Sequence, residues 1–394
     1  MIKTVAVNKF RGLNNKQDRA ALSNEWQETA DNVDIDDAQK LRRAPGITSY
    51  LSDVADIYHM RFRGLMYAIK TDGTLLEITA SANTEIASGI GDGPYYWAEL
   101  GVNTYLSWAD GGYEIRPDGV YPWGIPAPSG PQASTDSGPC EYGVALTFLR
   151  SDGIESPAST AYVWGEESAE ISIESVPTHP DCQTCIYVTP PDGARFYLAA
   201  KTAGGTQTIT AANDGFPLAT LNKAPPLYGR PVAGFDGALW LGIYDDAQDI
   251  TRLFHSLDNP YLYRYSDPGY DLPGRVLFQA PARNALVVGT SRAVFAIAPA
   301  DDGNYSAIML TEYPAVESSY GWDEYGVLYF ATTHGLCKYP DFQPLTDGMY
   351  AIPFAGECPL LIADRRGFRQ CLVSVPTNGI RHNPYGDRLT PTEI

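Results

Sequence analysis

Six short stretches of this chain repeat one pattern, in which a turn residue precedes a mostly apolar run. They are "RGLMYAI" (63–69), "VNTYLSW" (102–108), "DGALWLG" (236–242), "RNALVVG" (283–289), "YGVLYFA" (325–331) and, more weakly, "RGFRQCLVSV" (366–375). The turn residues are Gly64, Asn103, Gly237, Asn284, Gly326 and Gly367, at intervals of 39, 134, 47, 42 and 41 residues. Four intervals match the roughly forty to fifty residues of one propeller blade. The pattern predicts an all-β chain, a β-propeller of about six blades.

The composition also indicates many short strands and tight turns. The chain has 26 Tyr and 7 Trp beside 37 Gly and 30 Pro, and it lacks long helical runs of Ala, Leu, Glu and Lys. Within 62–79, Asp72-Gly73 predicts a hairpin turn, and Gly111-Gly112 predicts another in the next unit. A two-sheet sandwich or an irregular barrel would also give regularly spaced strands.

The one long interval exceeds a blade by about ninety residues and contains a segment of different character. It is bounded by the proline-rich stretches 121–131 and 222–231, as expected of linkers into and out of an inserted domain. Inside, strand-like runs alternate with Asp-Gly and Pro turns, which favours a small β-sandwich. "SDGIESPAS" and "IYVTPPDGARFYLAA" resemble a fibronectin type III module. We therefore expect first propeller blades in 1–126, an inserted sandwich in 127–225, and the remaining blades in 226–394.

The charge balance restricts the classes of partner. There are 47 acidic and 28 basic residues, a formal net charge of −19. A face that binds duplex DNA sequence-specifically would have to work against this field, whereas an acidic surface lets DNA pass without sticking. No apolar run reaches the roughly twenty residues of a membrane span and no signal peptide is recognisable, so we expect a soluble protein made in a cytoplasm.

The cysteines and histidines offer one weak metal motif. The six cysteines are spread through a large chain, so we expect free thiols. "HPDCQTC" places His179, Cys182 and Cys185 at ligand spacing, but zinc needs four ligands, and Cys140 could serve only if the fold brings it near. The alternative is a surface loop with one thiol at a strand edge. We expect no bound metal and no other cofactor.

The stretch "NVDIDDAQKLRRAPG" (32–46) allows two interpretations. Asn32, Asp34 and Asp36 have the spacing of a calcium loop, but the required Gly is Asp37 and the required Glu is Arg43. The alternation of Val33 and Ile35 with acids instead predicts a strand that turns at 36–39 into a second strand around Leu41. Pro45-Gly46 would end that strand. A hairpin is the better interpretation.

No motif in the sequence indicates catalysis. The histidines are not accompanied by a Gly-x-Ser-x-Gly elbow, and neither a Walker loop nor a dinucleotide-binding glycine motif is present. Paired carboxylates cannot be recognised without their separation. We therefore expect a protein that is not an enzyme.

Residues 10–50 resemble the N-terminal signature of the tail nozzle, or tail tubular protein B, of short-tailed bacteriophages. That signature has Phe and Gly near the start, then Ala-x-Asn-Val, an acidic turn and Leu-Arg-Arg-x-Pro-Gly. The matching positions are Phe10, Gly12, Leu13, Ala30, Asn32, Val33, Leu41, Arg42, Arg43, Pro45 and Gly46. The acidic turn usually carries a Gly, where this chain has Ala38 and Gln39. The resemblance covers about a tenth of the chain.

The resemblance implies a structural virion protein in the viral tail, assembled in the cytoplasm of a host bacterium. It implies a homo-hexamer below the portal and the adaptor, through which viral DNA is ejected without sequence-specific binding. Tail fibres or spikes would dock on the inserted sandwich. Asn32, Arg42, Arg43, Pro45 and Gly46 would be assembly contacts; our hypothesis is that the two arginines fix the hairpin or contact a neighbour.

A function of another class is also open. The chain could be a carbohydrate-binding or glycan-cleaving β-propeller, a receptor-binding tail protein with the sandwich as its sugar module. Exposed aromatic residues near paired acids would favour that function. Self-complementary side surfaces on the chain and an open axis in its ring would instead favour the hexamer through which viral DNA is ejected.

Overall fold

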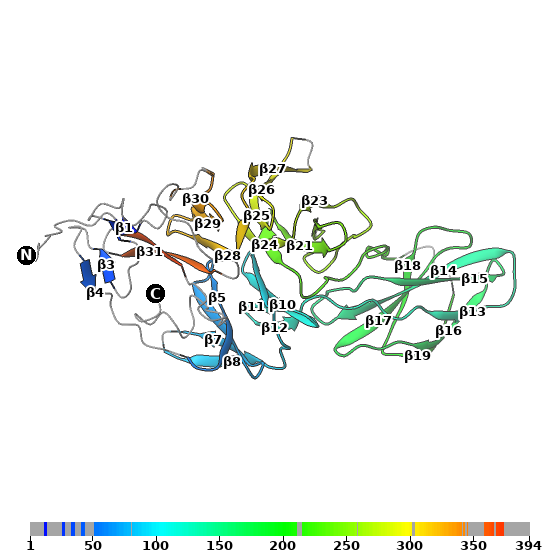
Figure 1. The fold of residues 1–394 in the computed structure, drawn as a ribbon. Helices are drawn as coiled ribbons and strands as arrows, with labels where there is room; N and C mark the ends of the chain where they lie inside the picture. Colours follow the sequence, from blue (N-terminus) through cyan, green and yellow to red (C-terminus); the bar gives the residue numbers. More distant parts are fainter. Residues whose placement is uncertain are drawn as a thin grey trace, which may run out of the picture.

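The computed structural model describes residues 51–79, 81–210, 215–257, 259–301, 304–340, 342, 345, 358–365 and 368–373, and four short strands within 12–43. Every regular element in these residues is a β-strand (Figure 1). The described residues contain no helix that could cross a membrane. The all-β prediction is therefore confirmed.

From β5 onward, and outside the long central segment, consecutive strands form antiparallel sheets in chain order. Blade 1 consists of β5 (Val54–Met60), β6 (Leu65–Lys70), β7 (Leu75–Ile78) and β8 (Asn83–Ala87). Blade 2 consists of β9 (Tyr96–Leu100), β10 (Asn103–Trp108), β11 (Gly111–Arg116) and β12 (Gly119–Pro122). Each is the meander of a propeller blade.

The chain returns to the same pattern after the central segment. Blade 3 consists of β20 (Val232–Phe235), β21 (Ala238–Asp245), β22 (Ile250–His255) and β23 (Tyr270–Pro273). Blade 4 consists of β24 (Val276–Pro281), β25 (Leu286–Thr290), β26 (Val294–Pro299) and β27 (Tyr305–Thr311). Blade 5 has β28 (Ala315–Trp322), β29 (Leu328–Thr332) and β30 (Gly335–Lys338). A further pair follows, β31 (Leu360–Arg365) and β32 (Phe368–Val373).

The repeated turn residues of the sequence fall between the first and second strands of the sheets. Gly64, Gly237 and Gly326 lie in these turns with φ of 63°, 76° and 76°, a conformation that glycine adopts without strain. Asn103 opens β10 directly after its turn, and Asn284 lies between β24 and β25. Gly367 is outside the described residues, in the gap between β31 and β32. The repeat in the sequence is therefore the repeat of the blades.

Successive blades stack through their faces, as in a propeller. The first strands β9, β20, β24, β28 and β31 contact one another in that order. Apolar clusters fill the spaces between neighbouring sheets: Leu106 and Trp108 lie against blade 1, Trp240 lies between blades 3 and 4, and Phe278 and Phe330 lie between blades 4 and 5. These contacts confirm the β-propeller prediction.

Blades 1, 2 and 5 meet at the end of their first strands. The Glu99 carboxylate accepts hydrogen bonds from the Tyr58 hydroxyl (2.9 Å) and from the backbone N–H groups of Arg61 (2.8 Å) and Phe62 (3.1 Å). The Arg61 guanidinium lies over the ring of Trp322, 4.1 Å from its centroid. Blade 1 is thus tied to blade 2 by an acid and to blade 5 by a cation–π contact.

The central segment forms two facing sheets. One contains β13 (Gln132–Ser134), β16 (Glu170–Val176) and β19 (Gly205–Thr210). The other has the order β15 (Ser159–Gly165), β14 (Cys140–Arg150), β17 (Cys182–Val188) and β18 (Tyr197–Thr202). Tyr142, Leu146, Ile171 and Ile186 are fully buried in a shared core. This sandwich forms one end of the molecule in Figure 1, beyond blade 2.

The segments that lead into and out of the sandwich lie side by side. The Tyr228 hydroxyl donates a hydrogen bond to the Trp123 carbonyl (2.5 Å), and the two ring centroids are 6.1 Å apart. A Cβ on Gly124 would lie 2.7 Å from Cδ of Pro226. The chain therefore leaves and rejoins the propeller at one place, which is how an insertion preserves the fold that it interrupts.

Two predicted hairpins are confirmed and one turn was misplaced. Asp72-Gly73 joins β6 to β7. β3 (Val33–Ile35) pairs antiparallel with β4 (Leu41–Arg43), with Asp34 opposite Arg42. β1 (Gly12–Leu13) and β2 (Trp26–Gln27) pair in parallel.

The turn predicted at Gly111-Gly112 lies instead at 109–110, and the two glycines open β11. The two glycines allow aromatic rings to pack closely against β11. A Cβ on Gly111 would lie 2.7 Å from the Trp108 ring, and one on Gly112 would lie 3.0 Å from the rings of Trp123 and Tyr228.

Gly234 provides a test of the contact between the first strands of blades 2 and 3. A Cβ at this position would lie 1.7 Å from the Glu99 carbonyl oxygen, so β9 and β20 would have to separate. We expect Gly234→Ala to lower the free energy of unfolding in urea by about 1–3 kcal/mol or more, as overpacking does. The matched control is Gly130→Ala, where a Cβ would have no neighbour within 4 Å. Equal urea midpoints for the two variants would contradict the packing described.

Candidate functional site

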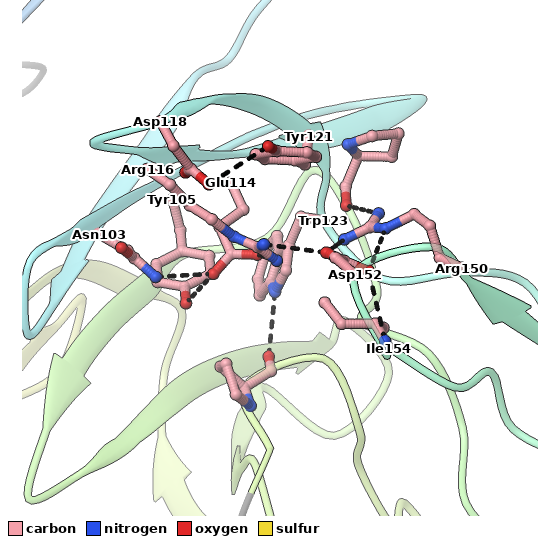
Figure 2. Close-up of polar contacts among 12 residues, drawn as sticks. Asn103, Tyr105, Glu114, Arg116, Asp118, Tyr121, Trp123, Arg150, Asp152 and Ile154 are labelled. Carbon is pink, nitrogen blue, oxygen red and sulfur yellow. Dashed lines mark hydrogen bonds and ion pairs between the residues drawn. The ribbon is translucent and has the colours of Figure 1, made fainter. Parts of the chain in front are cut away.

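The candidate site is a group of partly buried charges where the sandwich joins blade 2, shown in Figure 2. We call it the junction cluster, and it consists of Asn103, Tyr105, Glu114, Arg116, Arg150 and Asp152. Glu114 and Arg116 lie on β11 of blade 2. Arg150 ends β14, and Asp152 follows it in the turn towards Ile154. The cluster therefore spans the propeller and the inserted domain.

The propeller half of the cluster is organised around Glu114. One carboxylate oxygen accepts hydrogen bonds from the Tyr105 hydroxyl (2.7 Å) and the Asn103 amide (2.9 Å). The other accepts a hydrogen bond from the Arg116 guanidinium (2.7 Å). Glu114 and Arg116 are two apart on β11, so both side chains project from the same face of the strand. Both oxygens of this buried carboxylate are thus occupied.

The sandwich half is organised around Asp152. Its carboxylate accepts two hydrogen bonds from the Arg150 guanidinium, at 3.0 and 2.9 Å. Arg116 donates across the junction to the same carboxylate (2.9 Å). Arg150 also donates to the Pro122 carbonyl at the end of β12 (2.9 Å). Two guanidinium groups therefore each bridge the propeller and the sandwich.

Local sequence positions the sandwich carboxylate. "RSDGI" (150–154) forms a turn in which the backbone of Arg150 donates to the Ile154 carbonyl (2.9 Å). Gly153 takes φ of 87°, which suits a tight turn. Asp152 accepts a long hydrogen bond from the Ile154 backbone N–H (3.3 Å), a bond that Asp commonly makes in turns. The turn holds Asp152 facing Arg150.

The charges alter the pKa values of the cluster. Burial by itself would raise the Asp152 pKa, but hydrogen bonds from Arg150, Ile154 and Arg116 lower it from 3.8 to about 2. Burial would lower the Arg116 pKa, but bonding to Glu114 and Asp152 raises it instead. Burial and the adjacent Glu114 raise the pKa of the Tyr105 hydroxyl. The shifts of Asp152 and Arg116 favour the ion-paired state, and the shift of Tyr105 keeps its hydroxyl protonated as a donor to Glu114.

This arrangement supports a mechanical role better than a chemical one. A general acid or base works best with a pKa near the working pH, and Asp152 is far below neutrality. The carboxylates and guanidinium groups of the cluster are hydrogen-bonded to one another. A partly buried network of complementary charges instead fixes geometry, because separating any partner leaves a charge without compensation. The junction cluster acts as a clamp that sets the sandwich on the propeller.

The three metal-ligand candidates of the sequence do not converge. Nδ1 of His179 lies 3.5 Å from Sγ of Cys182. Cys185 is three positions further along β17, so its side chain projects from the opposite face. It is buried among Ala145, Tyr187 and Phe196, and burial raises its pKa to about 11. In the described part of the chain, no group of three or more His, Cys, Asp or Glu could hold a metal.

The possible fourth ligand is distant. Cys140 begins β14, whereas Cys182 pairs with Arg150 at its other end, about 33 Å away at the usual rise of a strand. The cysteines with described side chains, Cys140, Cys182, Cys185, Cys337 and Cys358, are all free thiols, as predicted.

The family-signature residues are described only in part. Arg42 and Arg43 lie in β4, opposite Asp34 and Val33 of β3. Asn32, Pro45 and Gly46 lie outside the described residues. The structure thus gives the backbone pairing of the two arginines, and their role in assembly stays a prediction.

Comparison with known proteins identifies no family. No protein-family model matches the sequence, and no curated protein matches it. Similar solved structures include the β-propeller domain of Cps50 (Swd1) from Myceliophteria thermophila, 8% identical over 88% of this chain and 100% of that chain, with a TM-score of 0.35. BBS1N, crystallised in complex with ARL6DN, is 15% identical over 86% and 92% of the two chains, with a TM-score of 0.31. Streptogramin B lyase is 12% identical over 73% and 93%, with a TM-score of 0.23.

These likenesses are too low to indicate a function. The class of protein is defined by the strand order and packing described above, a β-propeller interrupted by a β-sandwich. Sequence reasoning missed the junction cluster, because its members lie in two domains and carry no motif. The one available signal was "RSDG", in which Arg150 and Asp152 flank Ser151 at an Asp-Gly turn, and such a turn by itself predicts no partner in the propeller.

Replacing Asp152 by Asn tests the clamp. At neutral pH we expect a lower free energy of unfolding by about 1–3 kcal/mol, since two guanidinium groups lose a charged partner. The Asp152 pKa is depressed in the folded state, so its contribution is full above the ordinary pKa of 3.8 and is lost as pH falls through about 2. The difference between wild type and variant should therefore shrink between about pH 4 and pH 2.

The control for that experiment is Asp267→Asn. Asp267 pairs with Arg264 at the surface (3.3 Å), where an ion pair contributes about 0–1 kcal/mol. Urea unfolding at several pH values measures both variants. A deficit of Asp152→Asn that is equally large at the lowest and highest pH would contradict an electrostatic clamp.

Proposed function

We propose that this chain is a structural virion protein, a tail nozzle subunit of the tail tubular protein B family of short-tailed bacteriophages. In this role its copies form a hexameric ring that extends the portal and adaptor channel for genome ejection. The observation that carries the proposal is the N-terminal stretch 10–50, with "ADNV" and "LRRAPG" at the ends of an acidic turn. The backbone hairpin of β3 and β4 in that stretch is compatible with it.

The architecture supports the proposal. A propeller interrupted by a β-domain is the fold that the resemblance implies. The sandwich projects from the propeller at one end of the molecule (Figure 1), and the junction cluster holds it there (Figure 2). A projecting domain on a rigid joint is suited to carry a fibre or spike, because load on it is transmitted to the ring rather than absorbed at a hinge. We assign the docking of fibres or spikes to the sandwich.

The charge supports a conduit for DNA rather than a DNA-binding protein. Phosphate contacts by Lys and Arg hold DNA through counterion release, and the net charge of −19 disfavours such contacts over the molecule as a whole. The described arginines of the junction cluster are bonded to carboxylates. We therefore propose that DNA slides through the ring without sequence-specific binding and that the chain is not an enzyme.

A carbohydrate-binding propeller is the second candidate, and one observation favours it. Tyr162 and Trp164 are exposed on the same side of β15, a strand at the edge of the sandwich. Exposed aromatic side chains stack on sugar rings. A glycan array probed with the whole chain would detect sugar binding. If Trp164→Ala abolishes that binding and the chain stays monomeric, the result favours the carbohydrate-binding function over the ring.

The ring is tested by native mass spectrometry of the whole chain, alone and with the adaptor protein of the same virus. We expect hexamers, formed alone or on the adaptor, and electron micrographs of rings with an open axis. A chain that is monomeric in both conditions would overturn the proposal. The measurement requires no knowledge of the contact residues.

The two arginines of β4 provide a second test. Changing Arg42 and Arg43 together to Glu would replace two bases by two acids in the strand that pairs with the acidic strand β3. We expect tail assembly to be impaired and the DNA affinity of the protein to be unchanged. An intact ring that loses DNA binding would show that these residues contact DNA instead.

A further inference from the structure

An edge strand of the sandwich carries two exposed aromatic side chains, which we call the aromatic face. Tyr162 and Trp164 of β15 are 58% and 57% exposed, and their spacing of two directs both side chains to one side of the strand. β15 pairs with β14, and the described residues place no strand on its other side. Val163, between the two rings, packs on the sandwich core. Exposed aromatic groups on an open sheet edge commonly mark an interaction surface.

The aromatic face lies away from the propeller. β14 begins at Cys140 and ends at Arg150 in the junction cluster, and Trp164 pairs opposite Glu141, near the beginning of that strand. In Figure 1 β15 lies in the part of the sandwich that projects beyond the blades. The face is therefore open to a partner that approaches the free end of the sandwich.

Carboxylates surround the two rings. Residues opposite each other in a ladder share a face, so Glu141 lies beside Trp164. The Asp192 carboxylate accepts a hydrogen bond from the Glu141 backbone N–H (2.8 Å), and the Asp192 N–H donates to the Glu141 carbonyl (2.9 Å). Glu166 and Glu167 follow β15 directly and are exposed. The aromatic face thus lies among four acids.

No described base offsets this charge. No ion pair in the described residues joins any of the four acids to a base. The guanidinium of Arg195, which lies in the same loop as Asp192, is over the ring of Tyr197 at 5.7 Å from its centroid. Burial raises the pKa of the Cys140 thiol at the start of β14, and three of the four acids raise it further. The surroundings of the aromatic face are therefore negative.

The rings and the charge together indicate the chemistry of the partner. A guanidinium group gains both from stacking on an aromatic ring and from hydrogen bonds to carboxylates. A neutral sugar also stacks on such rings, but it gains nothing from the summed charge of four acids. An acidic partner, including a second copy with its net charge of −19, is repelled. The aromatic face therefore fits a protein segment rich in arginine.

The open edge of β15 indicates how such a segment would bind. An extended chain can add to a free strand edge through backbone hydrogen bonds, and its alternate side chains then point to one face. Arginines at every second position would all lie on the side of Tyr162, Trp164 and Glu141. We propose that the aromatic face docks an extended, arginine-rich segment of the fibre or spike protein, an inference that rests on the docking role proposed above for the sandwich.

The test measures binding of a fluorescein-labelled peptide to the whole chain by fluorescence anisotropy. In the peptide Arg alternates with Ser over about nine residues, long enough to span β15. We expect saturable binding that weakens as salt rises, and no binding of the same peptide with Glu in place of Arg. Trp164→Ala should weaken binding about fivefold through the lost cation–π contact, whereas Trp164→Phe keeps a ring and most of the affinity. Glu141→Gln with Asp192→Asn should weaken binding about tenfold.

The matched controls change the same kinds of side chain on the propeller. Tyr325→Ala removes an aromatic ring that is 76% exposed, and Glu85→Gln with Glu324→Gln removes two exposed acids. Both should leave the affinity for the arginine peptide unchanged. Thermal unfolding midpoints within a few degrees of wild type show that each variant folds. Equal losses of affinity in the controls and in the variants of the aromatic face would overturn this face as the site.

A second measurement connects the aromatic face to the docked protein. Fibre or spike protein of the same virus should bind the chain about tenfold more weakly when the chain carries Glu141→Gln and Asp192→Asn. An excess of the arginine peptide should displace it from the wild-type chain. Unchanged binding of the fibre or spike to this variant would overturn the assignment.

The outcomes distinguish this inference from the ring. Hexameric rings that do not bind the arginine peptide would overturn the inference and leave the nozzle standing. A chain that is monomeric with and without the adaptor, yet binds the peptide through Trp164, would overturn the nozzle and support the aromatic face as a docking surface. A wild-type chain that binds neutral oligosaccharides through Trp164 but not the arginine peptide would overturn the inference in favour of the carbohydrate-binding function.

Discussion

Each described propeller blade of this protein has two apolar faces, and burying both requires a packing partner on each side. In blade 4, for example, Ile297 packs on the cluster shared with blade 3, while Val287 packs on the cluster shared with blade 5. A sheet of this kind is stable only between two others, which arranges the blades side by side around their first strands. The order of blades in space therefore follows the order in the chain. The insertion is tolerated because its two connections meet at one point, beside Trp123.

The junction cluster solves a different problem, which is how two independently packed domains are held in a fixed orientation. At the junction, Ile125, Phe148 and Ile154 form a small apolar cluster. Arg116 and Arg150 instead fix the orientation of the two domains, since planar guanidinium groups bind carboxylates and carbonyls in defined geometries. For a tail nozzle this would give a stiff projecting platform.

Much of the fold could be predicted from the sequence because its signals are local. A glycine with positive φ between two apolar runs, as at Gly237, forms a turn whatever surrounds it, so the repeat gave the first turn of each blade. The hairpin around Asp34 and Arg42 follows from alternation within fifteen residues. The prediction was wrong where a glycine has a packing role, as at Gly111, since its neighbour Trp108 makes the space tight. The resemblance to tail nozzles depends on the sequence alone.

The sequence by itself determined the class of structure and the spacing of the blades, because hydrophobic periodicity and turn chemistry act over a few residues. Only the tertiary structure decided which distant side chains meet. It brought Arg116 to Asp152 across the domain junction, and it separated Cys185 from Cys182 although they are three residues apart. The reason is that a strand directs alternate side chains to opposite faces, while charges pair wherever packing leaves them close in a region of low dielectric constant.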